Sequence, residues 1–203
     1  WKQFYKPMEI GERLIVIPEW ESANVPAGRA ALVLNPGLTF GTGSHATTRL
    51  CLTELKQQIH GGEKVLDLGC GSGILSIAAL VLGASRAFAC DIDEKCVDVA
   101  YENAALNGVG RDRYTVRWGD VLTDRQLQGE FGGEYDIVVA NIVADVIMGL
   151  SGRVRPFLKE GGLFLCSGII DDRAEEVADK LRADGWTILK TRQSEGWFSY
   201  LCK

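Results

Sequence analysis

The sequence predicts an α/β fold, with a doubly wound, mostly parallel seven-stranded sheet, a C-terminal antiparallel strand and a short N-terminal β extension. Beyond residue 64, short β-branched apolar runs alternate with longer helical patterns, which is typical of βαβ units and a parallel sheet. The last two apolar runs, 186–191 and 197–202, are joined by a few polar residues, too short a link for the crossover that parallel strands need. These two strands must therefore pair antiparallel.

The individual elements follow from the same patterns. In the alternating part, strands are expected at 65–68, 87–90, 114–118, 137–140, 163–166, 186–191 and 197–202. Helices with apolar residues at spacings of three and four are expected at 74–82, 94–107, 146–158 and 173–183. Before this part, strands are expected at 13–18 and 30–34, and a helix at 47–59. We therefore expect an N-terminal β extension or linker over 1–34 and one main domain over 35–203.

Length and composition indicate an ordinary globular domain. The 203 residues suffice for a core, and no apolar run approaches the roughly 20 residues of a membrane span. No signal-peptide pattern opens the chain, so we expect a cytoplasmic protein without membrane association. The net charge of -5 argues against direct nucleic-acid binding, which favours excess Lys and Arg. Because the chain begins at Trp1 rather than Met, it can be a fragment that lacks an N-terminal domain.

The cysteines and histidines do not predict a metal site. The 6 cysteines form no Cys-x-x-Cys pair, and several lie inside apolar runs, where cysteine behaves as a small buried hydrophobe. With 2 histidines beside them, no tetrahedral zinc spacing is present. We expect reduced thiols and no metal.

The strongest local motif is the run Val-Leu-Asp-Leu-Gly-Cys-Gly-Ser-Gly that begins at position 65, where a strand enters a glycine turn that opens a helix. Glycines there let the backbone approach a ligand, and the helix start favours a carboxylate or phosphate. A dinucleotide fingerprint, Gly-x-Gly-x-x-Gly, would need its third glycine at position 74, which is an isoleucine. Here the spacing is Gly-x-Gly-x-Gly, formed by Gly69, Gly71 and Gly73. Together with Asp67, which suits a ligand with an ammonium group as well as a carboxylate, this spacing favours S-adenosylmethionine as cofactor.

Three aspartates that follow the next two strands are candidate ligand contacts or turn residues. Asp91 ends the second predicted strand, where a carboxylate accepts hydrogen bonds from both ribose hydroxyls of a nucleoside. Asp93 is better placed to cap the helix that follows it. Asp120 follows the third predicted strand, where contact with an adenine and a simple turn are equally good interpretations. The alternative for the whole group is an unrelated α/β nucleotide binder.

Asn141 follows the fourth predicted strand, in the run Asp-Ile-Val-Val-Ala-Asn-Ile-Val-Ala at 136–144. Ligands of open α/β sheets bind outside the carboxyl ends of the strands, near the topological switch point. A carboxamide there can accept a hydrogen bond from an incoming amine and aim its lone pair at a methyl group. The alternative is a strand-to-helix turn residue, since Asn suits turns, and the residues alone leave both open.

The run Asn-Pro-Gly-Leu-Thr-Phe-Gly-Thr-Gly-Ser-His-Ala-Thr-Thr at 35–48 is rich in glycine and threonine. It is similar to the Pro-Gly-x-x-Phe-Gly-Thr-Gly-x-His-x-Thr-Thr loop of the bacterial ribosomal protein L11 methyltransferases, a family that nearly the whole chain resembles. The similarity continues through Asp67–Gly73, Asp91-Ile-Asp93, Glu102-Asn103 with Asn107-Gly108, Val139-Ala-Asn141-Ile and Ser167-Gly168-Ile169.

The resemblance implies a class I S-adenosylmethionine-dependent fold and N-methylation of lysine or α-amino groups of ribosomal protein L11. Asn141 would be the catalytic residue that orients the amine, and Thr48 and the loop at 37–44 would cover the site. His45 is interpreted as a residue that orders the loop by hydrogen bonding, in preference to a general base. The residues with implied cofactor contacts are Phe40, Thr48, Gly69, Asp91 and Asn141. The motifs add Asp67, Gly71, Gly73 and Asp120 as candidates.

The chain departs from that family at several points. Ala46 stands where the family usually has Pro, and Gly196 interrupts its usual Glu-Glu-Trp. The family's N-terminal domain, which docks the ribosomal protein, has no counterpart in these residues. The acceptor therefore stays open, with another amine, either a small molecule or RNA, as the alternative. A dinucleotide-dependent oxidoreductase and a non-catalytic cofactor-binding module are more distant alternatives, and the oligomeric state is not predicted.

Overall fold

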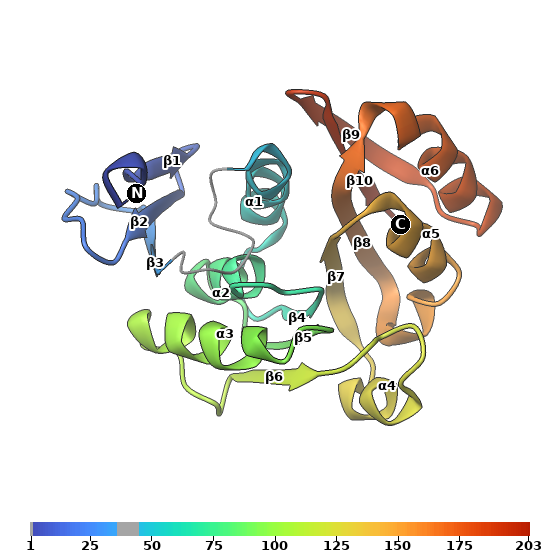
Figure 1. The fold of residues 1–203 in the computed structure, drawn as a ribbon, viewed down its shortest axis with the longest axis horizontal. Coiled ribbons are helices and arrows are strands. Elements are labelled where there is room, and N and C mark those ends of the chain that lie inside the picture. Colours follow the sequence, from blue (N-terminus) through green and yellow to red (C-terminus); the bar gives the residue numbers. More distant parts are fainter. Residues whose placement is uncertain (1, 36–44) are drawn as a thin grey trace.

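The computed structural model of the protein describes residues 2–35 and 45–203. Within these residues the strands form a three-stranded sheet, of order β1-β2-β3, and a seven-stranded sheet, of order β6-β5-β4-β7-β8-β10-β9 (Figure 1). The strands are β1 (Met8–Ile10), β2 (Leu14–Pro18), β3 (Ala30–Leu34), β4 (Lys64–Leu68), β5 (Arg86–Asp91), β6 (Tyr114–Trp118), β7 (Tyr135–Asn141), β8 (Leu158–Ile170), β9 (Ile188–Ser194) and β10 (Trp197–Cys202). The helices are α1 (Ala46–Gln58), α2 (Ile74–Val81), α3 (Lys95–Leu106), α4 (Arg125–Phe131), α5 (Ala144–Ser151) and α6 (Asp171–Ala183), with 3₁₀ turns η1 (Lys2–Phe4) and η2 (Arg155–Phe157).

The large sheet is doubly wound about β4. The chain runs outward from β4 through β5 to β6 and then returns to β7 on the other side of β4, so the topological switch point lies between β4 and β7. All neighbouring pairs from β6 to β8 are parallel, whereas β10 is antiparallel to both β8 and β9. The predicted fold class, with its antiparallel ending, is confirmed.

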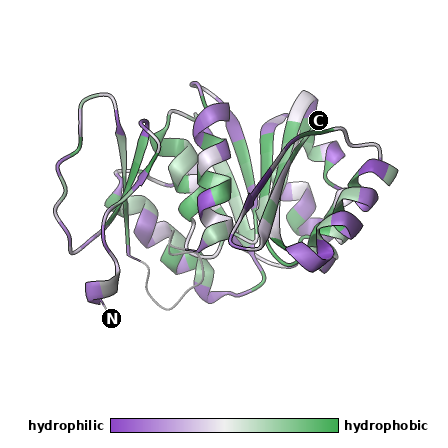
Figure 2. Cartoon of the chain, turned by 90° about the horizontal axis from the view of Figure 1, so that it is seen from above, coloured by the Kyte–Doolittle hydropathy of each residue, from purple (hydrophilic) through white to green (hydrophobic). Residues whose placement is uncertain are grey.

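Helices cover both faces of the large sheet. α1, α2 and α3 pack on the face that carries Val65 and Val139, and α4, α5 and α6 pack on the face that carries Leu66 and Val138. Because both faces of the parallel strands are buried, consecutive strand residues are apolar. Figure 2 shows hydrophobic strands in the interior and hydrophilic residues on the outer sides of the helices. No helix within residues 2–35 and 45–203 is both long enough and apolar enough to cross a membrane.

The small sheet lies at one end of the molecule, beside α2 and α3 (Figure 1). Its buried side chains belong to the same apolar cluster as those of α2 and α3. Asn107 of α3's C-terminal cap pairs with both backbone groups of Val33, accepting from its nitrogen at 2.7 Å and donating to its oxygen at 2.7 Å. Asn103 accepts a hydrogen bond from the backbone nitrogen of Asn35 at 2.9 Å. These two amides position the end of β3, just before residue 36.

The predicted helix at 146–158 is wrong beyond Ser151, where α5 ends. Pro156 has no amide hydrogen and cannot continue a helix, and it lies in η2, after which the chain enters β8. Val154 continued the apolar spacing because it is completely buried in the turn, not because the helix continues. β8 is consequently much longer than the strand predicted at 163–166.

The remaining differences are small. β9 begins at Ile188 rather than at Trp186, whose ring packs against Phe164 at a centroid distance of 5.4 Å and whose Nε1 donates to the oxygen of Ser151 at 2.7 Å. The sequence patterns missed α4 and β1, which are too short to show a clear period. Neither change alters the position of the candidate site.

Candidate active site

A cavity of about 410 Å³ opens at the carboxyl ends of β4, β5 and β7, beside the switch point. Open α/β sheets bind ligands at this position, and small-molecule sites have volumes of about 300–1,000 Å³. The residues lining it are His45, Thr47, Asp67, Gly69, Cys70, Gly71, Ile74, Leu75, Asp91, Asn141, Ile142, Val143, Val146, Gly168 and Trp197. The structure thus brings the glycine turn, Asp67, Asp91 and Asn141 to one cavity.

The glycine turn after β4 forms one wall. Its glycines all have positive φ: Gly69 +74°, Gly71 +54° and Gly73 +84°. A side chain at Gly69 would place its Cβ 2.5 Å from Cγ2 of Ile142, so the backbone approaches β7 as closely as a glycine allows. The backbone nitrogens of Gly69 and Cys70 both donate to the oxygen of Cys90, each at 2.9 Å. Gly73 does not line the cavity but begins α2 as its left-handed N-cap.

Asp91 links this turn to β5. Its Oδ2 accepts a hydrogen bond from the backbone nitrogen of Gly71 at 2.9 Å, and its Oδ1 accepts one from that of Asp93 at 2.9 Å. Both oxygens are therefore oriented by backbone groups, on the wall of the cavity. Asp93 accepts from the nitrogen of Lys95 at 3.0 Å, in the local role expected for it, although the N-cap of α3 is Glu94.

Asp120 lies in a turn after β6. Its Oδ1 accepts a hydrogen bond from the backbone nitrogen of Leu122 at 2.9 Å. It is not among the described residues that line the cavity. The geometry agrees with the turn interpretation, and a contact with adenine stays a prediction.

Asp67 is a buried carboxylate beneath the glycine turn, with 1% of its surface exposed. Its Oδ2 accepts two hydrogen bonds from Ser76, one from Oγ at 2.7 Å and one from the backbone nitrogen at 3.2 Å. Burial raises the pKa of Asp67 to about 6, and the charge of Asp91 adds to this rise, although the bonds from Ser76 oppose it. Tyr114 contacts Ser76 in turn, with 2.8 Å between the two hydroxyl oxygens. Sequence analysis found Asp67 but missed Ser76 and Tyr114, because nothing local connects them.

Asn141 ends β7 and contacts the start of α1. Its Nδ2 donates a hydrogen bond to Oγ1 of Thr48 at 3.3 Å, and Thr48 is completely buried. Since the amide nitrogen of Asn141 donates to Thr48, the side-chain oxygen of Asn141 is the atom that can accept a hydrogen bond from an amine. Thr48 itself lies behind the lining residues.

His45 is the N-cap of α1. Its Nδ1 accepts from the backbone nitrogen of Thr47 at 3.3 Å and lies 2.8 Å from that residue's Oγ1. Its ring packs edge-on against Trp197, with the centroids 5.0 Å apart. These contacts fix His45 at the start of α1, and its role in ordering the loop stays a prediction. Ala46 occupies the first helical position, where proline is also tolerated, so its departure from the family pattern leaves the helix start intact.

The lining that comes from the residues after β7 and from β8 and β10 was largely missed as part of the site by sequence analysis. It contains Ile142, Val143, Val146, Gly168 and Trp197. The available signals were the Val139-Ala-Asn141-Ile and Ser167-Gly168-Ile169 motifs and the Glu195-Gly196-Trp197 run, which were noted for their relation to the family rather than as parts of the site. Phe40 and the loop at 37–44 lie outside the described residues.

The cysteines are buried as free thiols. Burial raises the pKa of Cys90 and of Cys96 to about 12, which disfavours the nucleophilic thiolate. In the part of the chain that the structure describes, no group of three or more His, Cys, Asp or Glu side chains could hold a metal ion.

Comparison with known proteins places the whole chain in one family. The family model described as "Ribosomal protein L11 methyltransferase (PrmA)" matches residues 1–203. Relatives named ribosomal protein L11 methyltransferase include one from Desulforamulus reducens, 46% identical over 202 residues, and one from Caldanaerobacter subterraneus subsp. tengcongensis, 44% identical over 203 residues. Both matches cover 100% of this chain, which spans 63% of the length of each of these curated relatives.

Solved structures agree with this assignment. The crystal structure of a ribosomal protein L11 methylase from Lactobacillus delbrueckii subsp. bulgaricus has a TM-score of 0.87 at 30% identity, and the match covers 98% of both chains. A putative S-adenosylmethionine-dependent methyltransferase from Streptococcus mutans, 17% identical with a TM-score of 0.67 over 79% of this chain and 50% of its own, shares the fold. The resemblance inferred from the sequence is confirmed, and the chain belongs to the ribosomal protein L11 methyltransferase family.

Proposed function

We propose that the protein transfers methyl groups from S-adenosylmethionine to lysine or α-amino groups of ribosomal protein L11. The observation that carries this proposal is one cavity that joins the glycine turn, the oriented carboxylate of Asp91 and the carboxamide of Asn141. A sheet edge that can bind a nucleoside lies beside an amide oxygen that can accept a hydrogen bond from an amine. This combination suits methyl transfer better than hydride transfer. The names of the relatives support L11 as the acceptor.

The residues of the cavity fit the cofactor. The turn at Gly69, Gly71 and Gly73 forms a backbone cradle with positive φ, which would hold the methionine end near the start of α2. Asp91 would accept hydrogen bonds from the ribose hydroxyls, and the buried charge of Asp67 would favour the ammonium group. Thr48 would contribute by accepting the hydrogen bond that orients the side chain of Asn141. Phe40 and Asp120 remain candidate contacts from the sequence.

When bound, S-adenosylmethionine supplies a sulfonium methyl group, whose transfer to a neutral amine forms a C–N bond, breaks the C–S bond and releases a proton. Asn141 would accept a hydrogen bond from the amine and orient its lone pair. A free lysine has a pKa of about 10.4, and the apolar side chains of Ile142, Val143 and Val146 would lower it by desolvating the ammonium form. Positioning of this kind can contribute roughly 7–11 kcal/mol.

The remaining expectations belong to the same proposal. Residues 1–34 would form a β extension or linker, and 35–203 the methyltransferase domain, with the boundary at the end of β3. A ribosomal protein acceptor and a net charge of -5 support a cytoplasmic enzyme that binds neither nucleic acid nor membrane directly.

The test is intact-mass spectrometry of purified L11 after incubation with this chain and S-adenosylmethionine. We expect methyl-sized mass increments, a loss of at least about 100-fold in rate for Asn141→Ala, and an unchanged rate for Asn24→Ala, an exposed asparagine outside the cavity. Calorimetry with S-adenosylmethionine runs in parallel. Cofactor binding without methylated L11 would refute the acceptor, and full turnover by Asn141→Ala would refute the role of the carboxamide.

A further inference from the structure

The two walls of the cavity differ in chemistry. The wall formed by β4, α2 and β5 carries the carboxylates Asp67 and Asp91 beside the apolar Cys70, Ile74 and Leu75. The wall formed by β7, α5 and β10 has no carboxylate among its described lining residues and is mostly apolar. Asn141 lies where the two walls meet, at the switch point. A ligand with polar groups fits the first wall. An apolar stem that ends in one polar atom, placed at Asn141, fits the second.

Trp197 is held rigidly on the apolar wall. It begins β10 directly after Glu195 and Gly196, whose φ values of +51° and +78° match a two-residue type I′ hairpin turn. Its backbone is paired on both sides, with Ser194 of β9 and Ile170 of β8. Its ring is also fixed by the edge-on contact with His45. The ring is only partly buried, so a preorganised apolar surface faces the cavity.

Val143 forms the other side of this wall and is 64% exposed. It occupies the N-cap of α5, where it makes no side-chain capping bond, although Ser, Thr, Asp or Asn at this position would stabilise the helix. Helix stability therefore does not explain a valine here. Gly168 allows β8 to pass close to this segment, because a Cβ at this position would lie 2.3 Å from the backbone oxygen of Ile142. An exposed apolar residue on the lip of a cavity is instead suited to contact a ligand.

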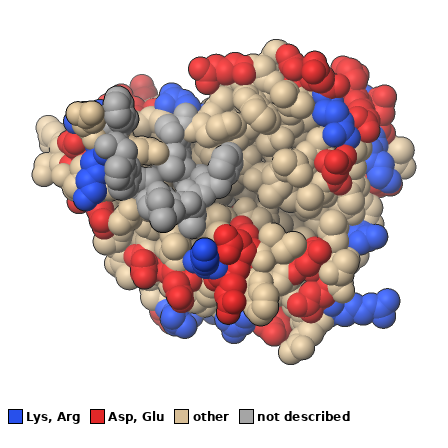
Figure 3. All heavy atoms as spheres, viewed as in Figure 1, with Lys and Arg blue, Asp and Glu red and all other residues tan. Residues whose placement is uncertain are grey.

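Carboxylates flank the same lip. Asp171, Asp172 and Glu195 are exposed, and the backbone nitrogen of Asp171 donates to the oxygen of Gly196 at 2.9 Å, which brings the start of α6 beside the hairpin turn. Figure 3 shows acidic side chains along the edge of the molecule above β9 and α6. Arg173 of the same helix is paired with Asp145 and Glu176 and does not cancel them.

We infer that Trp197 and Val143 determine acceptor specificity, by packing on the unbranched alkyl stem of a lysine side chain that reaches Asn141 from a positively charged protein segment. This inference rests on the proposed function. The stem supplies the apolar contact, and the carboxylates of Asp171, Asp172 and Glu195 complement the charge of the segment.

The first test measures the binding of L11 by calorimetry to the full chain loaded with S-adenosylhomocysteine, together with KM for L11. We expect Trp197→Ala and Val143→Ala each to weaken L11 binding and raise KM about tenfold, with Trp197→Phe close to wild type. The affinity for S-adenosylhomocysteine should change less than about twofold. Matched controls are Leu189→Ala and Val25→Ala, exposed apolar residues outside the cavity, which should change nothing.

Unchanged L11 binding in Trp197→Ala and Val143→Ala would overturn the inference, as would an equal loss of affinity for S-adenosylhomocysteine. If Trp197→Ala does not fold, the inference is tested by the other two variants. Val143→Ala must then weaken L11 binding while Trp197→Phe stays close to wild type. A wild-type chain that binds L11 but transfers no methyl group would refute the proposed function and leave this inference to be judged on binding.

The second test addresses charge. The triple variant Asp171→Asn, Asp172→Asn, Glu195→Gln should weaken L11 binding and flatten its dependence on salt. A control with the same change in net charge, Asp98→Asn, Glu102→Gln, Asp112→Asn, alters exposed carboxylates elsewhere and should keep the wild-type salt dependence. If the two triple variants bind L11 with the same affinity and salt dependence, the carboxylates of Asp171, Asp172 and Glu195 do not contribute to L11 binding.

Discussion

The two walls of the cavity are built in different ways. The wall that would hold the cofactor comes from one continuous stretch, between Asp67 and Asp91, and its backbone is fixed by short-range hydrogen bonds such as those to Cys90. The apolar wall is assembled from Val143, Gly168 and Trp197, which come from separate elements of the chain. A local motif therefore encodes one wall, and packing between distant elements makes the other.

This difference predicts which substitutions damage which wall. Changes at contacts between β7, β8, α1 and β9 should alter the apolar wall while the glycine turn keeps its shape. Changes under the turn should alter the first wall alone.

The largest effect is expected for Gly168→Ala. The new Cβ would lie 2.3 Å from the backbone oxygen of Ile142, at a φ of +90°. Steric overlap and backbone strain together should lower the free energy of unfolding by about 4 kcal/mol. Gly185→Ala is the matched control, because Gly185 has a φ of +89° and nothing within 4 Å of its added Cβ.

Urea denaturation measures both variants. Gly185→Ala should lose about 1 kcal/mol, the cost of strain alone. Equal losses would show that the approach of Gly168 to Ile142 does not hold the end of β7 in place.

Asp67→Asn tests the other wall and should stabilise the protein. Asp67 has a pKa raised to about 6 from 3.8, so the folded state binds its proton more tightly than the unfolded state. The stability of the wild type therefore rises as pH falls from about 6 towards 4. Asn can still accept both bonds from Ser76, so the variant should gain up to about 3 kcal/mol at pH 7 and lose this pH dependence.

Denaturation between pH 4 and 8 checks this expectation, with Asp98→Asn on the exposed side of α3 as control. Cofactor affinity should fall in Asp67→Asn alone. Parallel pH curves for the wild type and Asp67→Asn would contradict the raised pKa.

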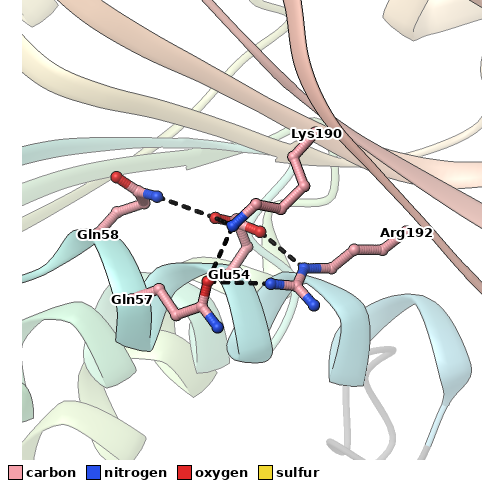
Figure 4. A network of polar contacts seen from close by, with 5 residues as sticks. All are labelled: Glu54, Gln57, Gln58, Lys190 and Arg192. Atoms are coloured by element: carbon pink, nitrogen blue, oxygen red, sulfur yellow. Dashed lines mark hydrogen bonds and ion pairs between the residues drawn. The ribbon is translucent and has the colours of Figure 1, made fainter.

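Glu54→Gln tests the attachment of α1 to β9, shown in Figure 4. Glu54 is 1% exposed and accepts from Nε of Arg192 at 2.7 Å, from Nζ of Lys190 at 3.5 Å and from Gln58 at 2.9 Å, while Gln57 accepts from the same two cations at 3.0 Å each. Burial alone would raise the pKa of Glu54, but the hydrogen bonds from Arg192 and Gln58 and the two positive charges lower it overall.

The contribution of this carboxylate is therefore complete above its unfolded pKa and lost as pH falls through the folded pKa. Glu54→Gln should cost about 2 kcal/mol at pH 7, and the difference from the wild type should shrink in acid. Glu176→Gln, which alters an exposed pair with Arg173, serves as control and should stay near the wild type. A difference that persists unchanged in acid would show that the charge of Glu54 is not responsible.

The smallest effect is expected for Gly196→Glu, which restores the usual residue of the family. Gly196 has a φ of +78°, but an added Cβ would meet Asp171 at an ordinary 3.8 Å. Backbone strain alone should lower the free energy of unfolding by about 1 kcal/mol. Gly196→Asn should lose less, because Asn tolerates positive φ. Thermal unfolding of both variants measures this, and a loss well above that of Gly185→Ala would mean that the hairpin turn is under additional constraint.

The fold could be predicted largely from the sequence because its signals are local. Alternating strand and helix patterns and the short link before Trp197 were sufficient for the sheet and its antiparallel end. The prediction of a helix at 146–158 was wrong because Val154 is buried in a turn and not in a helix. The spacing of apolar residues does not distinguish a buried turn from a further turn of helix. Of the candidate site, Asp67, Gly69, Gly71, Asp91 and Asn141 were found through residue types at strand ends, and all line the cavity.

The sequence by itself determined the family, the doubly wound sheet and the glycine turn with its two carboxylates, since each depends on residues close together in the chain. The tertiary structure alone decided that Thr48 lies against Asn141, that Ser76 holds Asp67, and that Trp197 and Val143 form an apolar wall. The physical reason is that these contacts join elements brought together by burial of apolar surface on both faces of the sheet, and no short stretch of sequence records which elements will meet.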